Sequence, residues 1–95
     1  MLRVFGAFEG DNLIGVIATR NKGTHIALFF VDGRYHSQGI GKKLFKIALK
    51  NNPYDKMTVN SSPYAIPVYY KLGFLDTDKD QVVNGLRFTP MEVKL

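Results

Sequence analysis

A junction between an apolar run and a basic helical pattern constrains this chain more than any other feature. The segment Val31–Leu44 reads V-D-G-R-Y-H-S-Q-G-I-G-K-K-L, so a strand-like run ends in a glycine-containing turn and an amphipathic pattern follows at once. The first amides of a helix have no internal partner, and the helix dipole places partial positive charge there. Gly39 and Gly41 let an anion approach the bare backbone. We therefore predict a strand, a turn and a helix that bind a pyrophosphate at the turn.

Length and composition favour a single soluble domain over residues 1–95. A chain of 95 residues buries only about two-thirds of its unfolded surface, so its core is modest. The hydrophobic share of 45% and the charged share of 22% exclude a disordered or fibrous protein. No apolar run approaches the roughly 20 residues that span a bilayer, and residues 1–4 lack the features of a secretory signal. We therefore expect no membrane partner. Since cysteine is absent, we also expect no disulfides and no metal, and a cytoplasmic location.

The net charge of +5 is concentrated in one part of the chain. Asp76, Asp78 and Asp80 follow later, so the basicity is local and suits a polyanionic small molecule better than a long duplex. We therefore expect no nucleic-acid partner, and a solvated helix face is the alternative role for any single lysine. The clustered cations are Arg34, Lys42, Lys43, Lys46, Lys50 and Lys56.

The first thirty residues have the pattern of antiparallel strands. Residues 3–9 and 13–20 are rich in Val, Ile, Phe and Leu, and Gly10-Asp11-Asn12 between them is typical of a hairpin turn. Asn21-Lys22-Gly23 predicts a second turn. Residues 25–31 are almost continuously apolar, which is typical of a strand that is covered on both faces. We expect this strand to be the central one.

Residues 39–50 have helical periodicity. Asn51-Asn52-Pro53 ends this helix, because proline disfavours helical geometry in the residue before it. One face is apolar, and Lys42, Lys46 and Lys50 line another. The apolar positions are Ile40, Leu44, Ile47 and Ala48.

A short strand and a short helix follow. Lys56–Ser61 reads as the strand. Ser62 and Pro63 suit the N-cap and the first position of a helix that runs to Leu72. Gly73 suits the left-handed position after the last turn of that helix.

The C-terminal part of the chain is extended. A strand begins near Phe74, and residues 87–95 predict a final strand in which Pro90 indicates an edge or a bulge. The strands that flank the first helix pair in parallel through a crossover. We therefore predict an α/β fold with a mixed, mostly antiparallel central sheet, a parallel pair at the cleft beside the predicted pyrophosphate turn, and two helices.

Four segments of the chain follow one another in a familiar order. They are the hairpin at Glu9–Val16, the motif His36-Ser37-Gln38-Gly39-Ile40-Gly41, the strand end Val59-Asn60 and the segment Tyr69–Phe74. Together they resemble the GNAT superfamily of acetyl-CoA-dependent N-acetyltransferases, whose Q/R-x-x-G-x-G/A signature is similar to the second segment and whose Y-x-K-L-G-F ending is similar to the fourth. A lone G-x-G is a weak signal, so the resemblance rests on the order and context of the segments.

The resemblance implies acetyl-CoA as cosubstrate and direct acetyl transfer to a small-molecule or peptide primary amine. The backbone amides from Gln38 to Lys42 would hold the pyrophosphate, although a tight helix start explains the same glycines. The backbone of Phe30 and Val31 would bind the pantetheine arm, and Asn60 would bond a pantetheine amide or cap the end of its strand. The implied cofactor-binding residues are Phe30, Val31, His36, Ser37, Gln38, Gly39, Ile40, Gly41, Lys42, Asn60 and Tyr70, with Arg34 or a lysine of the helix near the ribose phosphate.

The resemblance also implies a proton donor for the departing thiolate, and we assign this catalytic role to Tyr70. Tyr69 and Tyr64 are the neighbours most easily mistaken for it. A main-chain amide near Phe30 or Val31 would stabilise the oxyanion that forms during transfer.

No general base is assigned. Many members of the family carry a carboxylate on the central strand, whereas residues 25–31 carry none. Glu9, His25 and Asp32 stay open, and so does a chain of water molecules that leads to solvent.

The chain begins at or just before the second strand of the family's fold. It is a minimal member, a fragment, or a protein whose missing wall comes from a second subunit. Since self-association would also cover exposed apolar surface, we expect a homodimer. The alternative function is a non-catalytic module that senses acetyl-CoA or contacts a protein partner, because the missing wall and the unassigned base both allow it.

Overall fold

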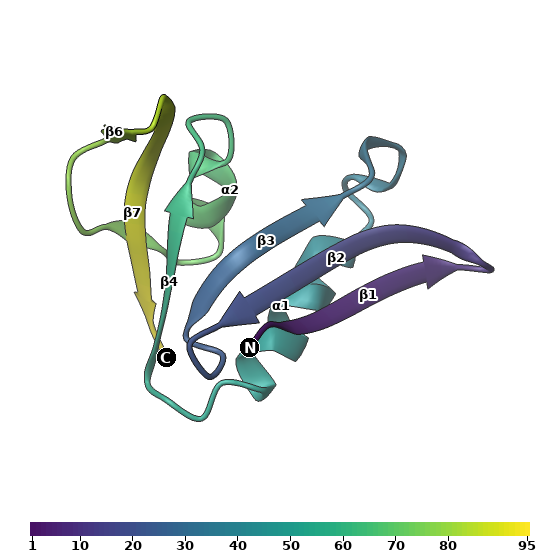
Figure 1. Cartoon of the computed structure of the whole chain (residues 1–95). Coiled ribbons are helices and arrows are strands. Elements are labelled where there is room, and N and C mark those ends of the chain that lie inside the picture. Colours follow the sequence, from purple (N-terminus) through teal and green to yellow (C-terminus); the bar gives the residue numbers. More distant parts are fainter. The chain divides into compact units, whose positions relative to one another are not determined.

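The computed structural model describes residues 1–95, which divide into two compact units, Met1–Pro53 and Tyr54–Leu95. Each unit is described by itself. The first is a three-stranded antiparallel sheet followed by a 3-10 turn and a helix (Figure 1). Its elements are β1 (Arg3–Glu9), β2 (Asn12–Arg20), β3 (His25–Val31), the 3-10 turn Gly33–Tyr35 and α1 (Ile40–Lys50). The predicted hairpin, third strand and first helix are therefore confirmed.

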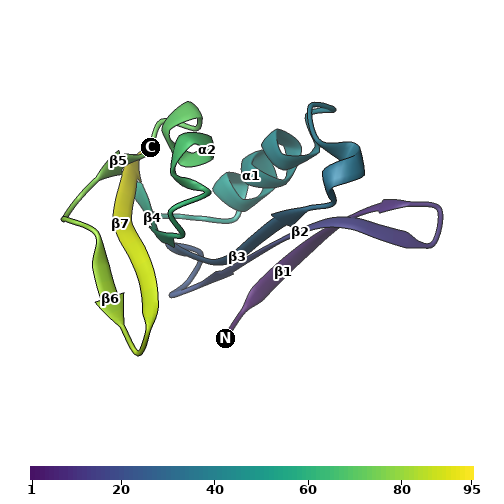
Figure 2. The same cartoon turned by 90° about the horizontal axis from the view of Figure 1, so that it is seen from above.

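α1 covers one face of this sheet (Figure 2). A Cβ at Gly15 of β2 would lie 3.1 Å from Leu44 Cδ1, so glycine lets the helix approach the strand closely. Ile47, which the periodicity assigned to the buried face, is 40% exposed. The other three predicted positions are confirmed: Ile40 and Leu44 lie against Gly15 of β2, and Ala48 is buried. Phe45, which the periodicity did not include, is buried with them.

The opposite face of the sheet is open. Leu28 and Phe30 of β3 lie on it, and each is more than half exposed. The expectation that β3 is covered on both faces is therefore wrong. The first unit contains one helix, and that helix occupies the other face. An apolar strand sequence indicates that burial would be favourable, but it does not show that another element covers the strand.

The second unit is built around the C-terminal strand. Its elements are β4 (Lys56–Ser61), α2 (Ile66–Lys71), β5 (Leu75–Asp76), β6 (Gln81–Val83) and β7 (Leu86–Lys94). β4, β5 and β6 each pair with β7 in antiparallel direction. Met57, Phe74 and Met91 are fully buried in its core. The extended segment predicted from Phe74 consists of two short strands rather than one.

α2 begins later than the sequence predicts. Ser62 and Pro63 lie in a turn that the Ala65 amide closes by donating to Ser62 O (3.2 Å), and Ala65 is the N-cap. Pro67 occupies the first turn of the helix, where the amide hydrogen that it lacks would have no intrahelical partner.

Neither α1 nor α2 is long and apolar enough to cross a membrane.

Gly73 ends α2 as predicted, with a φ of 97°. The Phe74 amide donates to Tyr69 O (3.0 Å) and the Gly73 amide donates to Tyr70 O (3.0 Å), which are the two hydrogen bonds of a Schellman motif. The rings of Tyr69 and Phe74 pack edge to face with their centroids 5.3 Å apart, and they supply the apolar contact that accompanies this motif. The Leu72-Gly73-Phe74 segment is therefore a helix stop.

Gly73→Ala will destabilise the fold by about 1–3 kcal/mol, because alanine is strained at a left-handed φ. Chemical unfolding followed by circular dichroism measures the change in the free energy of unfolding. Gly33→Ala is the matched control, since Gly33 has no positive φ and a Cβ there meets nothing within 4 Å. Equal stability of the two variants would contradict the role of Gly73 as a helix stop.

Pro90 lies inside a strand that is paired on both sides, so the prediction of an edge or a bulge is wrong. Asn60 of β4 pairs with it, and on the other side the Thr77 amide donates to Pro90 O (2.9 Å). The neighbouring strand is interrupted here, between β5 and β6. Since the N–H and C=O of a strand residue point to the same side, the missing amide hydrogen of Pro90 faces this interruption and costs the sheet little.

Candidate cofactor and catalytic site

The start of α1 leaves its backbone amides open. Gly39 is the N-cap, with φ 77° and ψ 7°, and neither a capping side chain nor an acidic residue lies in the first turn. Ser37 also takes a left-handed φ, of 68°, so the chain bends sharply before the helix. The amides of Ile40, Gly41 and Lys42 are thus uncapped donors at the positive end of the helix dipole. These are the groups that an anion site requires.

The two glycines of the turn have different surroundings. A Cβ at Gly39 would meet nothing within 4 Å, so the backbone there faces open space. A Cβ at Gly41 would lie 3.5 Å from Val31 Cγ2 and 3.7 Å from Phe29 Cζ, which belong to side chains of β3. Gly39 therefore leaves room for an anion, whereas Gly41 lets α1 approach β3.

Asp32 and Arg34 form a pair that shapes the turn. Asp32 Oδ1 accepts from Arg34 Nε (3.2 Å) and the Arg34 amide (2.9 Å), and Asp32 Oδ2 accepts from Arg34 Nη2 (3.0 Å). The hydrogen bonds from the side chain and from the amide of Arg34 lower the pKa of Asp32 to about 2. Asp32 is therefore a poor proton acceptor at neutral pH. The guanidinium of Arg34 lies against Asp32, although the sequence suggested a place near the ribose phosphate.

Arg34→Gln will raise the pKa of Asp32 from about 2 toward its ordinary value of 3.8, and the bond from the amide of residue 34 will keep it below that value. NMR titration of the carboxyl carbon measures this pKa. Because the folded pKa is depressed, the pair stabilises the fold above pH 3.8, and this contribution is lost as the pH falls toward 2. Arg87→Gln, which removes a similar pair with Asp80, is the control and leaves the Asp32 titration unchanged. A wild-type pKa near 3.8 would show that the pair does not form.

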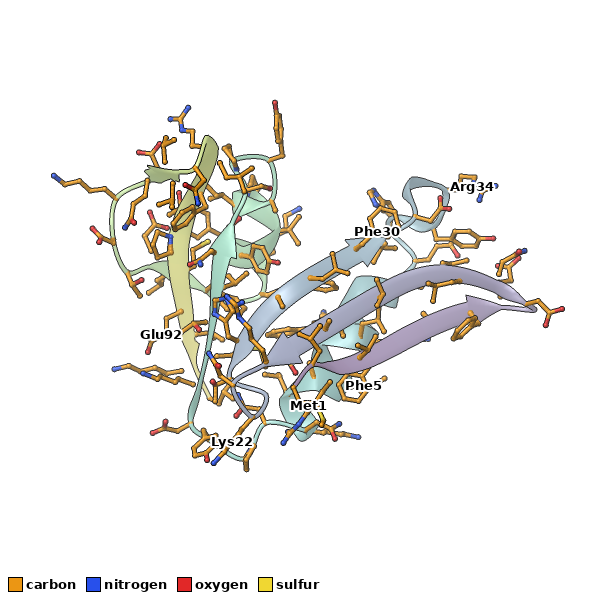
Figure 3. The ribbon with its side chains drawn as sticks, in the orientation of Figure 1. Met1, Phe5, Lys22, Phe30, Arg34 and Glu92 are labelled. Carbon is orange, nitrogen blue, oxygen red and sulfur yellow. The ribbon has the colours of Figure 1, made fainter.

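His36 uses its imidazole as well as its backbone. Nε2 lies 2.9 Å from Val31 O, and since a carbonyl only accepts, Nε2 carries the hydrogen. This bond folds the turn back onto the end of β3. Phe30 and Arg34 lie at the same end of the unit (Figure 3). The structure thus places Phe30, Val31 and the predicted pyrophosphate turn at one end of the first unit, whereas Asn60 belongs to the second unit.

Two of the three side chains considered as general base are poorly placed or unsuited. Asp32 is paired, and its pKa is low. His25 begins β3 and lies about 20 Å from Val31, given the rise of about 3.3 Å per strand residue. Glu9 lies beside the turn, where burial and then the Glu9 carboxylate raise the pKa of Tyr35. Of the three candidates for the general base, Glu9 is therefore the one that remains, and it lies close to the turn.

The second unit contains Tyr70 and a partner that sequence reasoning missed. The Tyr70 hydroxyl donates to Asp76 Oδ1 (2.6 Å), and this hydrogen bond raises the pKa of Tyr70 above its ordinary value of 10. Tyr70 is 47% exposed, so its hydroxyl is accessible and protonated at neutral pH. No sequence signal identifies Asp76, because a helix and a strand of the tertiary fold bring the two residues together. Asn60 has an exposed side chain on β4.

Tyr69 and Tyr70 differ in motif register and in environment. When Y-x-K-L-G-F is aligned with residues 69–74, its tyrosine falls at Tyr69 and its variable position at Tyr70. The motif therefore points to the residue before Tyr70, whereas the donor role predicted from the sequence is that of Tyr70. Tyr69 is only 6% exposed, and burial raises its pKa to about 12. Tyr64 is almost fully exposed in the turn before α2. Motif register therefore favours Tyr69 as proton donor, whereas accessibility of the hydroxyl favours Tyr70.

The candidate residues belong to both units. The first contains Phe30, Val31 and the turn at residues 36–42, and the second contains Asn60, Tyr70 and Asp76. Lys42, Lys43 and Lys46 are exposed on α1. No group of three or more His, Asp or Glu side chains is arranged to hold a metal ion.

The sequence matches the family model described as an acetyltransferase (GNAT) domain over residues 2–95. No curated protein matches the chain. A GCN5-related N-acetyltransferase from Rhodopseudomonas palustris is similar in structure over 99% of this chain and 62% of its own, with a TM-score of 0.86 and 21% identity. A GNAT-family acetyltransferase from Staphylococcus aureus Mu50 is similar over 99% and 68%, with a TM-score of 0.79 and 20% identity. The NatC complex bound to Gag peptide and CoA is similar over 97% and 70%, with a TM-score of 0.73 and 19% identity.

These structural likenesses show the fold. The predicted α/β fold with a mixed sheet and two helices is confirmed over nearly the whole chain. The chain spans only 62% of the Rhodopseudomonas structure and 68% of the Staphylococcus structure. Both solved structures therefore contain segments with no counterpart among these 95 residues.

Proposed function

The chain belongs to the GNAT acetyltransferase family, and on that premise we propose that it moves an acetyl group from acetyl-CoA directly to a primary amine. The observation that carries the proposal is the uncapped start of α1 behind the left-handed Gly39. A pyrophosphate is an anion that suits these amides. The CoA in the NatC structure, which shares this fold, supports coenzyme A as the ligand. The acceptor class is a small-molecule or peptide amine.

In this proposal, main-chain groups bind the cofactor more than side chains do. We propose that the amides from Gln38 to Lys42 bind the pyrophosphate, with exposed lysines of α1 adding positive charge. The backbone of Phe30 and Val31 binds the pantetheine arm. Asn60, whose side chain is exposed, bonds one of the pantetheine amides.

The transfer itself needs an electrophile, a proton for sulfur and a neutral amine. The amine nitrogen attacks the thioester carbonyl, a main-chain amide near Val31 stabilises the oxyanion, and the C–S bond breaks as the C–N bond forms. Tyr70 gives its hydroxyl proton to the departing thiolate, and the hydroxyl turns from Asp76 toward sulfur to do so. The surplus proton of the amine passes to Glu9 or to water, and Tyr70 regains a proton from solvent before the next turnover.

Steady release of free coenzyme A with a panel of primary amines tests this function. A thiol reagent reports the product directly, because the chain has no cysteine to react. We expect turnover with at least one amine and none without an amine. The material for this assay is the 95-residue chain, expressed in the cytoplasm, where we propose that the protein works.

A second candidate is a non-catalytic module that binds acetyl-CoA. The observation in its favour is that β3 carries no carboxylate and that Asp32, directly after it, has a pKa of about 2, so no strong general base is identified there. It predicts that acetyl-CoA raises the melting temperature while no amine in the panel supports release of coenzyme A. That pair of results would replace the enzyme proposal.

A further inference from the structure

The open face of the first sheet carries six large apolar side chains, each more than half exposed. We call this surface the open face. Its members come from the N-terminal end and from all three strands of the first unit. They are Leu2, Val4, Phe8, Leu13, Leu28 and Phe30.

The strand register places these side chains on one side of the sheet. Val4 and Leu28 both pair with Ala18, one from each neighbouring strand, and residues that pair across a sheet point to the same face. Gly6 and Phe30 pair with Val16 in the same way. The six side chains therefore form one surface and are not scattered positions.

Two contacts place Leu13 and Phe8 on the same surface. A Cβ at Gly6 would lie 3.0 Å from Leu13 Cδ1 and 3.1 Å from Phe8 Cε2, so both side chains lie over Gly6. Leu13 and Phe8 also pair with each other across the hairpin. Leu2 precedes Val4 by two residues, which is the period at which side chains of an extended chain share a face.

The open face is free of charge in its centre. The charged residues of its strands stand at strand ends, and Arg3 turns to the α1 side, where Nη1 donates to Asn51 O (2.6 Å). The lysines that dominate the net charge belong to α1, which packs on the opposite face (Figure 2). Two copies can therefore bring their open faces together without placing these lysines in the interface.

The exposed apolar area of the open face is comparable to that of a protein–protein interface. Six side chains of this kind, each about half exposed, amount to roughly 700 Å², which exceeds the roughly 300–600 Å² of the largest apolar patch on a typical monomer. Each partner of a stable complex contributes about 800 Å². β1 at one border of the face pairs only with β2, so its outer backbone groups also have no strand beside them.

We propose that the open face binds the open face of a second copy of this chain in a symmetric homodimer. A two-fold axis pairs the same patch on both subunits, and an uncharged apolar patch satisfies that requirement because it is complementary to itself. Covering it adds buried apolar area to a chain whose length limits the burial that its own fold provides. The dimer surface is independent of the acetyl-transfer proposal.

Sedimentation equilibrium of the full chain tests the proposal. We expect a mass of twice 10.7 kDa for the wild type and at least a tenfold weaker dimer for Val4→Lys and for Leu28→Lys, since each places two like charges in the interface. Leu86→Lys is the control, because Leu86 is more exposed than Val4 or Leu28 but lies on β7. A wild type that stays monomeric at about 100 μM overturns the proposal.

Cross-linking gives a second readout that does not depend on a destabilising charge. The chain has no cysteine, so Leu28→Cys and Leu86→Cys each carry one thiol. A bismaleimide should join two copies of Leu28→Cys and few copies of Leu86→Cys. Efficient joining of Leu86→Cys alone, or a dimer that Leu28→Lys leaves intact, assigns the contact to another surface and overturns this one.

Discussion

Gly39→Asp is expected to weaken coenzyme A binding by about 100-fold or more while the protein stays folded. Nothing lies within 4 Å of a Cβ at Gly39, so the side chain has room, and aspartate tolerates a left-handed φ better than most residues. Its carboxylate would accept hydrogen bonds from the uncapped amides at the start of α1, and its negative charge would repel the pyrophosphate that we propose binds there. Isothermal titration calorimetry with coenzyme A measures the loss.

Gly85→Asp is the control for this variant. Gly85 has a φ of 78°, almost the same as the 77° of Gly39, and a Cβ at Gly85 also meets nothing within 4 Å. The backbone cost of the two changes is therefore matched, whereas Gly85 lies in the turn between β6 and β7. Coenzyme A affinity should be unchanged in Gly85→Asp. Wild-type affinity in Gly39→Asp would mean that the start of α1 does not hold the phosphates.

Tyr70→Phe is expected to lower kcat by about 100-fold or more with the dissociation constant of coenzyme A unchanged, because it removes the proton for the thiolate and leaves the ring. The structure favours Tyr70 through its exposed hydroxyl, which is protonated at neutral pH. Stopped-flow or steady-state release of coenzyme A gives kcat, and calorimetry gives the dissociation constant.

Tyr69→Phe decides between the two adjacent tyrosines. Tyr69 stands at the tyrosine of the Y-x-K-L-G-F motif, but its ring is buried against Phe74. We expect Tyr69→Phe to retain most of the activity. Loss of kcat in Tyr69→Phe with retention in Tyr70→Phe would transfer the proton-donor role to Tyr69 and leave the acetyl-transfer proposal standing.

The pH profile gives the role of Asp76 a separate test. The protonated hydroxyl is the active form, so activity is lost as the pH rises through the pKa of Tyr70, which the bond to Asp76 raises above 10. Asp76→Asn removes the carboxylate and should move this loss to lower pH. Asp78→Asn, whose carboxylate accepts from the Lys79 amide and Gln81 Nε2, is the control and should leave the profile in place.

Features that depend on neighbouring residues were predictable from the sequence. The hairpin at residues 9–12, the start of α1 at Gly39 and the helix stop at Gly73 follow from turn chemistry, from the conformational freedom of glycine and from periodicity. The bond from the Arg34 amide to Asp32 is also local, and the preference of aspartate for such turns could have revealed it.

Features that join distant residues were not predictable in this way. Asp76 meets Tyr70 because β5 pairs with β7 beside the end of α2, and no rule of spacing links residues 70 and 76. Pro90 is tolerated in a doubly paired strand because the neighbouring strand is interrupted at that point. The exposure of Leu28 and Phe30 depends on which face α1 covers.

The sequence alone determined most elements of the fold, the turn that offers backbone amides to an anion, and the family resemblance. Each of these rests on backbone preferences or on residue order within a short segment. Only the tertiary structure decided which tyrosine has an accessible hydroxyl, which carboxylate holds it and which face of the first sheet stays uncovered. These properties depend on burial and on contacts between residues far apart in the chain, and a residue's own type and its immediate neighbours do not specify what packs against it.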